Sequence, residues 1–579
     1  MRLTKRMKWV ISIILLVSIA VVFSFNFVAS TLATKKLKEV IAKTPTKGYQ
    51  LTFRNVRVNL LTMSVVVKDI ELMPDSLLMA NYKNHVGDAK NIFALQIETL
   101  RLRHIDIYRV LGSKIIDLKA IELKKPTFTV YTGGGNPQKE HAKIDSPKNG
   151  LNLERIAIDG IGGVDINALI LDNFSLLIEN PISHDTVLYN TGLKSKLEKI
   201  YLIKNTNDSN TYRLVYNDLR FDVENENFRL AANSYALSFH KFSFVPGSSS
   251  IQIDSLKVIP TKNRFKMAAA FKFRADVFDV RVATIKMQLG NLTEMLKEGN
   301  FYLSHMLVDG LDLKILRNKS LPFDESKRPL LPNELLKKLK TNINIDSIQI
   351  RNSVLAYEES NSDGLPPMKV NLDNLTVDMK WITSMSDSML ANRPMAINLN
   401  AMLEKEIPLD VTFLFPLHST IDTFSYSGRL GSGKISIFNP ILQSAAGVTF
   451  SDGDLAGIDF TVQANSTYAM GEMTMLYSNL KGEVLKKQME ESNRFFTWIA
   501  NQVIKSDNPH ADDKPRVVPI YFSRDMYKGF GNFAFKPLLS GVLATTIPTF
   551  DASNQRKIDF IEKTSKKDIR RRKRQEKRD

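Results

Sequence analysis

The sequence predicts a mainly β protein, in which a single N-terminal transmembrane helix precedes an elongated, curved β-sheet with a few short helices. Three observations predict this fold. One charge-free apolar stretch lies near the N-terminus, a short strand pattern recurs along most of the chain, and segments with a helical period are few. Because 43% of the 579 residues are apolar and 24% are charged, most of the chain is expected to fold.

The composition excludes several classes of chemistry. The chain has no cysteine, which excludes disulfides, thiol catalysis, thiolate zinc sites and cysteine-ligated iron–sulfur clusters. Neither an H-E-x-x-H nor a G-x-S-x-G motif occurs. We therefore predict no catalytic residue, no metal site and no cofactor. The net charge of +18 lies largely in the two ends of the chain, so the mildly basic body does not predict a nucleic-acid partner.

The first element is the predicted membrane anchor at residues 9–34. This stretch has no charged residue, and as a helix its 26 residues would measure about 39 Å, enough for a hydrocarbon core of about 30 Å. Four basic residues within 1–8 predict a cytoplasmic N-terminus and a periplasmic body. A cleaved signal peptide is the alternative, although the apolar run is longer than the apolar region of an ordinary signal peptide. Residues 35–48 are expected to continue as a linker helix.

An eight-residue strand unit then recurs, with the pattern apolar-x-apolar-acid-x-apolar-x-apolar. Seven of its nine copies have an acidic residue at the fourth position, and 195–202 is a weaker tenth copy. The nine copies are 65–72, 95–102, 116–123, 151–158, 169–176, 251–258, 306–313, 343–350 and 370–377.

The unit has a physical interpretation as a bent strand. In a regular strand, positions one and three lie on one face and positions six and eight on the other. A β-bulge at positions four and five would bring all four apolar residues to one face and leave the acid exposed at the bend. Many such strands predict a long curved sheet, with ordinary β-sandwiches as the alternative. We expect the apolar face to line a groove through six residues: Leu171, Phe174, Val308, Leu311, Leu372 and Leu375.

These patterns divide the chain after the anchor into four regions. We predict an N-terminal β-rich repeat region at 49–320, a C-terminal β-rich region at 321–484, a helical and capping segment at 485–562, and a basic tail at 563–579. Pro332–Lys340 fits a short amphipathic helix, and 485–505 is the one long helical candidate. The sequence GRLGSGK at 428–434 is similar to a phosphate-binding loop, but 435–438 is expected to form a strand where such a loop needs a helix.

The C-terminal end combines an apolar segment with a basic one. Seven large apolar residues crowd into 530–543, a stretch too short to span a bilayer. It should either cap the β-rich body or rest on a membrane. In the second case, basic side chains of the tail would contact anionic lipid: Arg570, Arg571, Arg572, Lys573 and Arg574.

Three segments together resemble the AsmA-like family of bacterial envelope proteins. The first is the anchor followed by LTFRNVRVNLLTMSVVVKDIELMP at 51–74, and the second is the strand–turn–strand–proline segment at 95–131. The third is 424–480, where Asn439-Pro440, Gly447, Gly453, Leu455 and Gly471 match the family's run near the C-terminus.

The resemblance implies an apolar β-groove of the β-taco type, tethered to the inner membrane and facing the periplasm, that carries phospholipid or another envelope lipid toward the outer membrane. The repeat pattern agrees, because a curved sheet with one apolar face would suit acyl chains. The alternative is a non-catalytic scaffold or assembly factor for outer-membrane biogenesis, with an envelope or outer-membrane protein as partner and a filled interior. An enzyme is disfavoured by the absence of catalytic motifs.

Overall fold

The computed structural model describes a mainly β protein. Its described residues are 23–39, 41, 48–84, 92–131, 163–182, 186–204, 212–215, 221–230, 234–290, 295, 300–339, 342–360, 367–385, 393–417, 422–446, 448–484, 504–510 and 513–575. Most of the predicted anchor, the repeat copy at 151–158 and most of the helical candidate at 485–505 lie outside this set. Within it, no helix is both long and apolar enough to cross a membrane.

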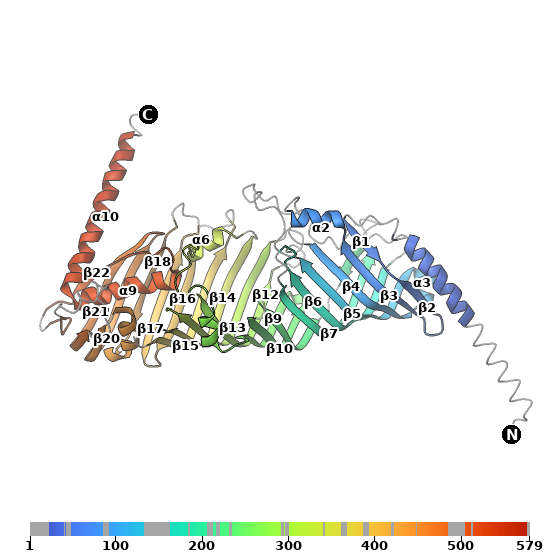
Figure 1. Ribbon diagram of the computed structural model, residues 1–579, viewed down its shortest axis with the longest axis horizontal. Coiled ribbons are helices and arrows are strands. Elements are labelled where there is room, and N and C mark those ends of the chain that lie inside the picture. Colours follow the sequence, from blue (N-terminus) through green and yellow to red (C-terminus); the bar gives the residue numbers. More distant parts are fainter. Residues whose placement is uncertain are drawn as a thin grey trace, which may run out of the picture. The chain divides into compact units, whose positions relative to one another are not determined.

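The chain divides into two compact units. One comprises Met1–Leu256 and Asn291–Gly299, and the other comprises Lys257–Gly290 and Asn300–Asp579. The strands of each unit form a large, open, mixed sheet with few helices, and β11 (Ser250–Pro260) contains the division (Figure 1). Open sheets, and not sandwiches, are therefore the architecture of both units.

In the first unit the sheet grows outward from β3, which pairs with β1, β2 and β4. The pairs β4–β5, β5–β6, β6–β7, β7–β9 and β9–β10 follow, β8 also pairs with β7, and β5–β6 is parallel. The elements are β1 (Tyr49–Thr52), β2 (Asn55–Asn59), β3 (Ser64–Pro74), α2 (Ser76–Lys83), β4 (Ile92–Ile105), α3 (Ile107–Ser113), β5 (Ile115–Tyr131), β6 (Gly163–Glu179), β7 (Thr186–Lys204), β8 (Tyr212–Val215), β9 (Phe221–Leu230) and β10 (Tyr235–Val245).

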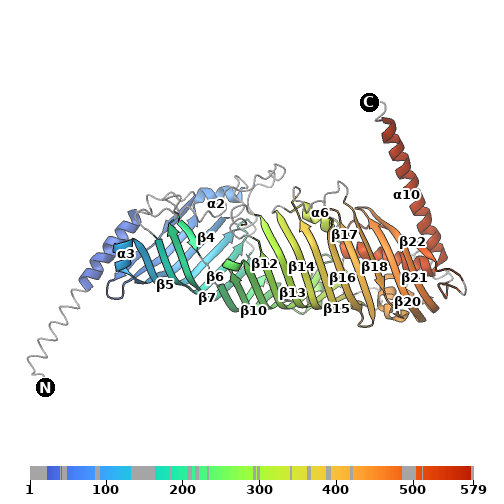
Figure 2. The same ribbon diagram turned by 180° about the vertical axis from the view of Figure 1, so that it is seen from behind.

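In the second unit, consecutive strands pair from β12 to β18, and β20, β21 and β22 continue the sheet (Figure 2). Its strands are β12 (Asp276–Leu289), β13 (Phe301–Asn318), β14 (Ile343–Ser360), β15 (Met368–Thr383), β16 (Met395–Leu403), β17 (Ile407–Phe415), β18 (Phe424–Leu430), β19 (Gly433–Lys434), β20 (Val448–Ala464), β21 (Tyr468–Val484) and β22 (Val517–Ser523). Its helices are α4 (Arg264–Ala269), α6 (Pro332–Lys337), α7 (Asn439–Ala446), α9 (Phe530–Thr546) and α10 (Pro548–Gln575).

The recurring unit contains the backbone bend that its pattern predicts. The fifth residue has a left-handed conformation, with φ between 48° and 66°, in five copies: Asp69, Asn173, Ser255, Gly310 and Asn374. Asp, Asn and Gly tolerate this conformation better than other residues, which explains why a short polar insert marks the bend. In three other copies the left-handed residue lies two positions after the unit: His104, Lys125 and Asn352. For these three copies the predicted position of the bend is wrong.

As expected, the bend brings apolar residues before and after it to the same face of the strand. Leu372 and Leu375 flank Asn374, yet both contact one cluster with Val377 and Ala401. Of the acids at position four, Glu98 and Asp346 are exposed, but Asp172, Asp254, Asp309 and Asp373 are half-buried. Asp309 is half-buried where its Oδ1 accepts a hydrogen bond from Asn352 Nδ2 of the neighbouring strand, at 2.7 Å.

The helices agree with the sequence at two places and differ at one. Residues 35–39 are helical, and α6 forms with Pro332 in its first turn. Residues 435–438 form a 3₁₀ turn that leads into α7, so the predicted strand there is wrong. The reason is that Ile435 is buried in the core, while the side chain of Asn439 forms two 2.8 Å hydrogen bonds with the backbone of Phe450 and holds the turn.

Candidate functional site

Apolar side chains form continuous rows across one face of the second unit's sheet. Residues directly opposite each other on paired strands share a face, so the strand register defines each row. One row, from β12 to β22, is Ile285, Val308, Ile350, Val377, Leu399, Val411, Gly428, Phe460, Met473 and Val518. The next is Met287, Met306, Ile348, Met379, Ile397, Phe413, Tyr426, Val462, Gly471 and Ile520. We call the face that carries both rows the apolar face.

The two ends of the apolar face differ in how far they are covered. In the second row, the side chains from Met287 to Phe413 are half-buried, whereas Tyr426, Val462 and Ile520 are buried. Helix α9 lies against β21 and β22 and supplies the cover there (Figures 1 and 2). In the second row, the residues from β18 to β22 therefore belong to a filled core, whereas Met287 and Met306 keep part of their surface accessible. In the first row, Ile285 and Val308 on the same two strands are buried.

The apolar segment at 530–543 is part of this cover. Phe533, Leu539 and Leu543 are buried in the core, and the rings of Phe530 and Phe424 meet edge-on at 5.5 Å. The sequence left two alternatives for this segment, a cap on the β-rich body or a membrane contact. In the structure the segment caps the sheet. The basic tail is not a separate segment, because α10 continues through residue 575; the side chains of 570–574 lie outside what the structure describes.

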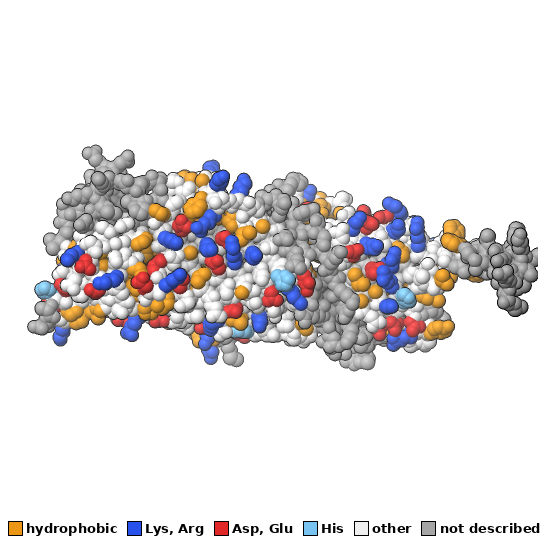
Figure 3. Space-filling model, turned by 90° about the horizontal axis from the view of Figure 1, so that it is seen from below, with side chains coloured by type: hydrophobic (Ala, Val, Ile, Leu, Met, Phe, Trp, Pro, Cys, Tyr) orange, Lys and Arg blue, Asp and Glu red, His pale blue; other side chains and the backbone are white. Residues whose placement is uncertain are grey.

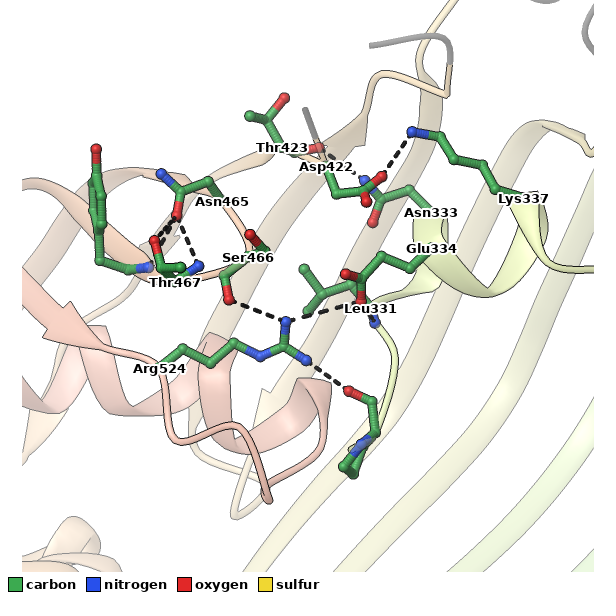
Figure 4. A network of polar contacts seen from close by, with 12 residues as sticks. Leu331, Asn333, Glu334, Lys337, Asp422, Thr423, Asn465, Ser466, Thr467 and Arg524 are labelled. Carbon is green, nitrogen blue, oxygen red and sulfur yellow. Dashed lines mark hydrogen bonds and ion pairs between the residues drawn. The ribbon is translucent and has the colours of Figure 1, made fainter. Parts of the chain in front are cut away.

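A network of buried polar contacts fastens the capped end (Figure 4). The guanidinium of Arg524 donates to the carbonyl oxygens of Pro329, at 2.6 Å, and Ser466, at 3.3 Å, and its side chain is only 2% exposed. Glu334 of α6 lies 3.9 Å from Arg524 and accepts a hydrogen bond from the backbone N–H of Leu331. Burial lowers the pKa of Arg524. The network joins α6, the β20–β21 turn and the approach to α9, which is a structural role.

A cluster of ionisable side chains interrupts the apolar face at one end of β12, β13 and β14. Arg317 pairs with Asp276 across the strands, with N–O distances of 2.7 and 2.6 Å. Tyr357 Oη donates to Glu359 Oε1 at 2.7 Å, and Lys319 forms an ion pair with the same glutamate. We call these five residues the polar cluster.

The polar cluster lies on the same face as the apolar rows. Arg317 follows Leu311, Leu313 and Ile315 at two-residue intervals on β13, and Glu359 is directly opposite Arg317. Glu359 is 6% exposed, and burial is the main cause of the raised pKa of Tyr357. The face thus changes along the strands from apolar residues to charged side chains, of which Arg317 is half-buried and Glu359 is buried.

Helix α9 brings one more cation to this place. The pKa of Lys536 is lowered to about 8, chiefly by burial and then by the charges of Lys319 and Lys528, while Glu359 acts in the opposite direction. Lys536 thus interacts electrostatically with Lys319 and Glu359 of the polar cluster. A lysine with this pKa is mostly protonated at neutral pH.

The opposite face of the same strands is polar. Acidic and basic side chains alternate across it, as in the cross-strand neighbours Asp279 and Lys314, and they are interspersed on the face seen in Figure 3. Ion pairs such as Lys314 with Asp312, at 3.2 Å, are partly exposed. Among the described strands, the continuous apolar rows therefore lie on one face of the sheet only.

The structure places four of the six predicted groove residues on this sheet. Val308 and Leu375 are buried, and Leu311 and Leu372 are half-buried. Leu171 and Phe174 belong to the first unit, where both are half-buried and Leu171 lies opposite Leu123 in the parallel β5–β6 pair. The sequence reasoning missed the polar cluster and Lys536, although two glutamates follow Tyr357 and a lone lysine stands within the apolar 530–543 segment.

The described residues contain no group of three or more His, Asp or Glu side chains able to hold a metal ion. No model of a known protein family matches the chain, and no curated protein matches it.

Proposed function

We propose that this chain is an inner-membrane-anchored protein of the bacterial envelope that binds phospholipid, or another envelope lipid, on its apolar face and passes it through the periplasm toward the outer membrane. The resemblance of the sequence to the AsmA-like family supports this role. Transfer of an intact lipid needs neither a nucleophile nor a cofactor, so it requires none of the catalytic motifs that the sequence lacks.

The observation that carries the proposal is the order of polarity along β12, β13 and β14. Half-buried apolar residues such as Met306, Leu311 and Leu313 lead to charged side chains on the same face, the half-buried Arg317 and the buried Glu359. An amphiphilic lipid has the same order, from acyl chain to headgroup. Lys319 and Lys536 would attract an anionic headgroup, since Lys536 adds a third cation to the two cations and two carboxylates of the polar cluster.

The alignment of the bends supports a sheet that curves around its apolar face. In the parallel pairs, the left-handed residues are direct neighbours: Lys125 lies beside Asn173, and Gly310 beside Asn352. Bulges on adjacent strands bend a sheet along a common line. A curved sheet would surround an acyl chain on more than one side and so exclude water from it.

Photo-crosslinking of the full chain tests the proposal. A benzoylphenylalanine in place of Leu313 would project from the apolar face, and one in place of Lys314 would project from the polar face, so neighbouring positions serve as probe and control. After purification in mild detergent and irradiation, mass spectrometry should find phospholipid joined to the chain at 313 and not at 314. Equal adducts at both positions, or none at 313, would contradict the proposal.

A scaffold or assembly factor is the second candidate, because the core beneath α9 is filled. The side chains of Phe415, Phe424 and Tyr426 are buried where β17 and β18 meet α9. A scaffold would therefore crosslink to a protein of the envelope or the outer membrane at positions 313 and 314 alike, without lipid adducts.

A further inference from the structure

The N-terminal helix covers one edge of the first unit's sheet with polar side chains. Helical residues 23–39 run beside β2, which among the described strands pairs only with β3 and so has one side without a strand partner. On that side, the backbone N–H of Val58 donates to Ser30 Oγ at 2.8 Å, and that of Val56 donates to Thr34 Oγ1 at 3.2 Å. The side chain of Asn26 continues the series, because its Oδ1 accepts from the N–H of Leu60 at 2.9 Å.

The spacing of these contacts follows from the geometry of the two elements. Asn26, Ser30 and Thr34 recur every four residues, a rise of about 6 Å along a helix. Alternate residues of a strand, here Leu60, Val58 and Val56, recur at about 6.6 Å. The three helix residues and the three strand residues therefore stay in step, and the edge is closed against further strands.

The turn between β2 and β3 exposes apolar side chains, and the backbone N–H groups of residues 60–62 all have hydrogen-bond acceptors. Leu61 is 79% exposed, and Leu60 and Met63 are 38% and 41% exposed. Asn59 Oδ1 accepts hydrogen bonds from the N–H groups of Leu61 and Thr62, at 3.0 and 3.1 Å. Together with the N–H of Leu60, three consecutive backbone N–H groups therefore donate to side-chain amide oxygens. Such pairing also occurs in turns that face water, where it is optional, but a turn in lipid requires it, because an unpaired N–H there costs several kcal/mol.

The outer face of the helix also exposes apolar side chains. Phe25, Val28 and Leu32 form a stripe, 53–64% exposed, on the side opposite Asn26, Ser30 and Thr34. Between helix and sheet lies a cleft of about 910 Å³ whose lining includes Arg57, Arg101 and Arg103. The carboxylate of Glu122 pairs with Arg101 and Arg103, at 3.7 and 2.6 Å, which leaves the arginines in excess.

From these contacts we infer that the end of the first unit is itself seated in a lipid bilayer: the β2–β3 turn and the side chains of Phe25 and Val28 enter the apolar layer, and the three arginines meet the phosphates of anionic headgroups. The depth is consistent with the predicted anchor, because a helix that enters the membrane at Trp9 reaches Asn26 after about 26 Å of a core about 30 Å thick. The inference rests on the proposed anchor, but not on lipid binding by the second unit.

Because the chain lacks cysteine, a single introduced cysteine can report the environment of the turn. Leu61→Cys carries the probe, and Leu77→Cys is the matched control, since Leu77 is 69% exposed on α2, which follows the opposite end of β3. Each full-length variant is labelled with a fluorophore and reconstituted into vesicles of phosphatidylethanolamine and phosphatidylglycerol. Quenching is then measured with nitroxide on the acyl chains and with iodide in the water.

The label at 61 is expected to be quenched by the lipid nitroxide and to have a several-fold lower Stern–Volmer constant for iodide than the label at 77. Equal access of iodide to both labels would overturn the inference. Protection at 61 without nitroxide quenching would also overturn it, because a protein partner or a second copy would then be the cover. Equal nitroxide quenching in vesicles without phosphatidylglycerol would overturn the role given to the arginines.

The outcome is independent of the lipid crosslink at position 313. A lipid crosslink at 313 together with a water-exposed label at 61 would support the proposed function and contradict this inference. A membrane-embedded label at 61 without the crosslink would support this inference and contradict the proposed function.

Discussion

At the scale of single residues, the apolar face is defined by side chains whose neighbours on adjacent strands are also apolar. Leu372 is an informative example, because it lies opposite Leu355 on one side and Leu403 on the other. It also contacts both the capped core and the cluster around Leu375. A charge at this place would face apolar atoms from three strands.

We therefore expect Leu372→Asp to lower the free energy of unfolding of the second unit by at least about 3 kcal/mol. Thermal unfolding followed through Trp381 fluorescence measures the change, since Trp381 lies on the same strand. Val354→Asp is the control, because Val354 is 37% exposed, and it should cost much less. Similar losses in both variants would show that the apolar face is not buried as described.

Lys536 gives the second unit a specific dependence on pH. Its pKa is about 8 in the folded protein and about 10.4 in an unfolded chain, so between these values the unfolded state binds more protons. Stability should consequently rise as pH increases from 8 to 10. Lys536→Met should flatten this rise and stabilise the protein at pH 7 by roughly 2 kcal/mol.

Unfolding midpoints measured at intervals between pH 7 and 10 test this expectation. Lys563→Met, which removes an exposed lysine of α10, should leave the slope unchanged. If the Lys536→Met protein keeps the slope of the unaltered chain, the burial assigned to this lysine is wrong.

At the scale of elements, the bends explain how a long strand such as β15 keeps one face apolar along its length. One of its two left-handed residues, Asn374 with φ of 48°, separates two apolar pairs that would otherwise lie on opposite faces. Asn374→Val should lower the unfolding free energy by about 1–2 kcal/mol, because a β-branched residue is strained in this conformation. Asn374→Gly should be close to neutral in the same thermal measurement. An equal loss in both variants would show that backbone strain is not the cause.

The capped end depends on a network that no single element could form. Arg524 connects α6, the β20–β21 turn and the segment before α9 through backbone carbonyls. Arg524→Met should cost about 3 kcal/mol, because buried carbonyl oxygens and Glu334 would lose their partner. Arg429→Met removes a guanidinium that is 73% exposed and paired with Asp459, and should cost under about 1 kcal/mol. Chemical denaturation of both proteins under identical conditions would separate these costs.

At the scale of the whole molecule, the proposed function requires a particular orientation across the membrane. The four basic residues before Trp9 predict that residues 1–8 are cytoplasmic and that the chain after about residue 34 is periplasmic. A reporter fused after Asp579 should therefore be active only if it requires the periplasm. Activity of a reporter that requires the cytoplasm, fused at the same place, would rule out this orientation.

The sequence alone determined the mainly β class, the existence of bends with one apolar face, α6, and the crowding of apolar residues before the tail. These features follow from local patterns: alternation of period two, short polar inserts that tolerate positive φ, and proline at a helix start. It could not place the bends after 95–102, 116–123 and 343–350, because these depend on the register of the neighbouring strand. It also missed the turn at 435–438, where burial of Ile435 overrides the strand pattern.

The tertiary structure decided which residues meet. Strand pairing brings Arg317, Glu359 and Asp276 together on one face, although the three belong to different strands and lie far apart in the chain. Packing of α9 gives Lys536 its altered pKa, and the helix beside β2 joins Asn26, Ser30 and Thr34 to an edge that is distant from them in the sequence. The physical reason is that local sequence sets the conformation and polarity of each strand, whereas a binding surface arises from contacts between strands and helices whose register only the folded sheet fixes.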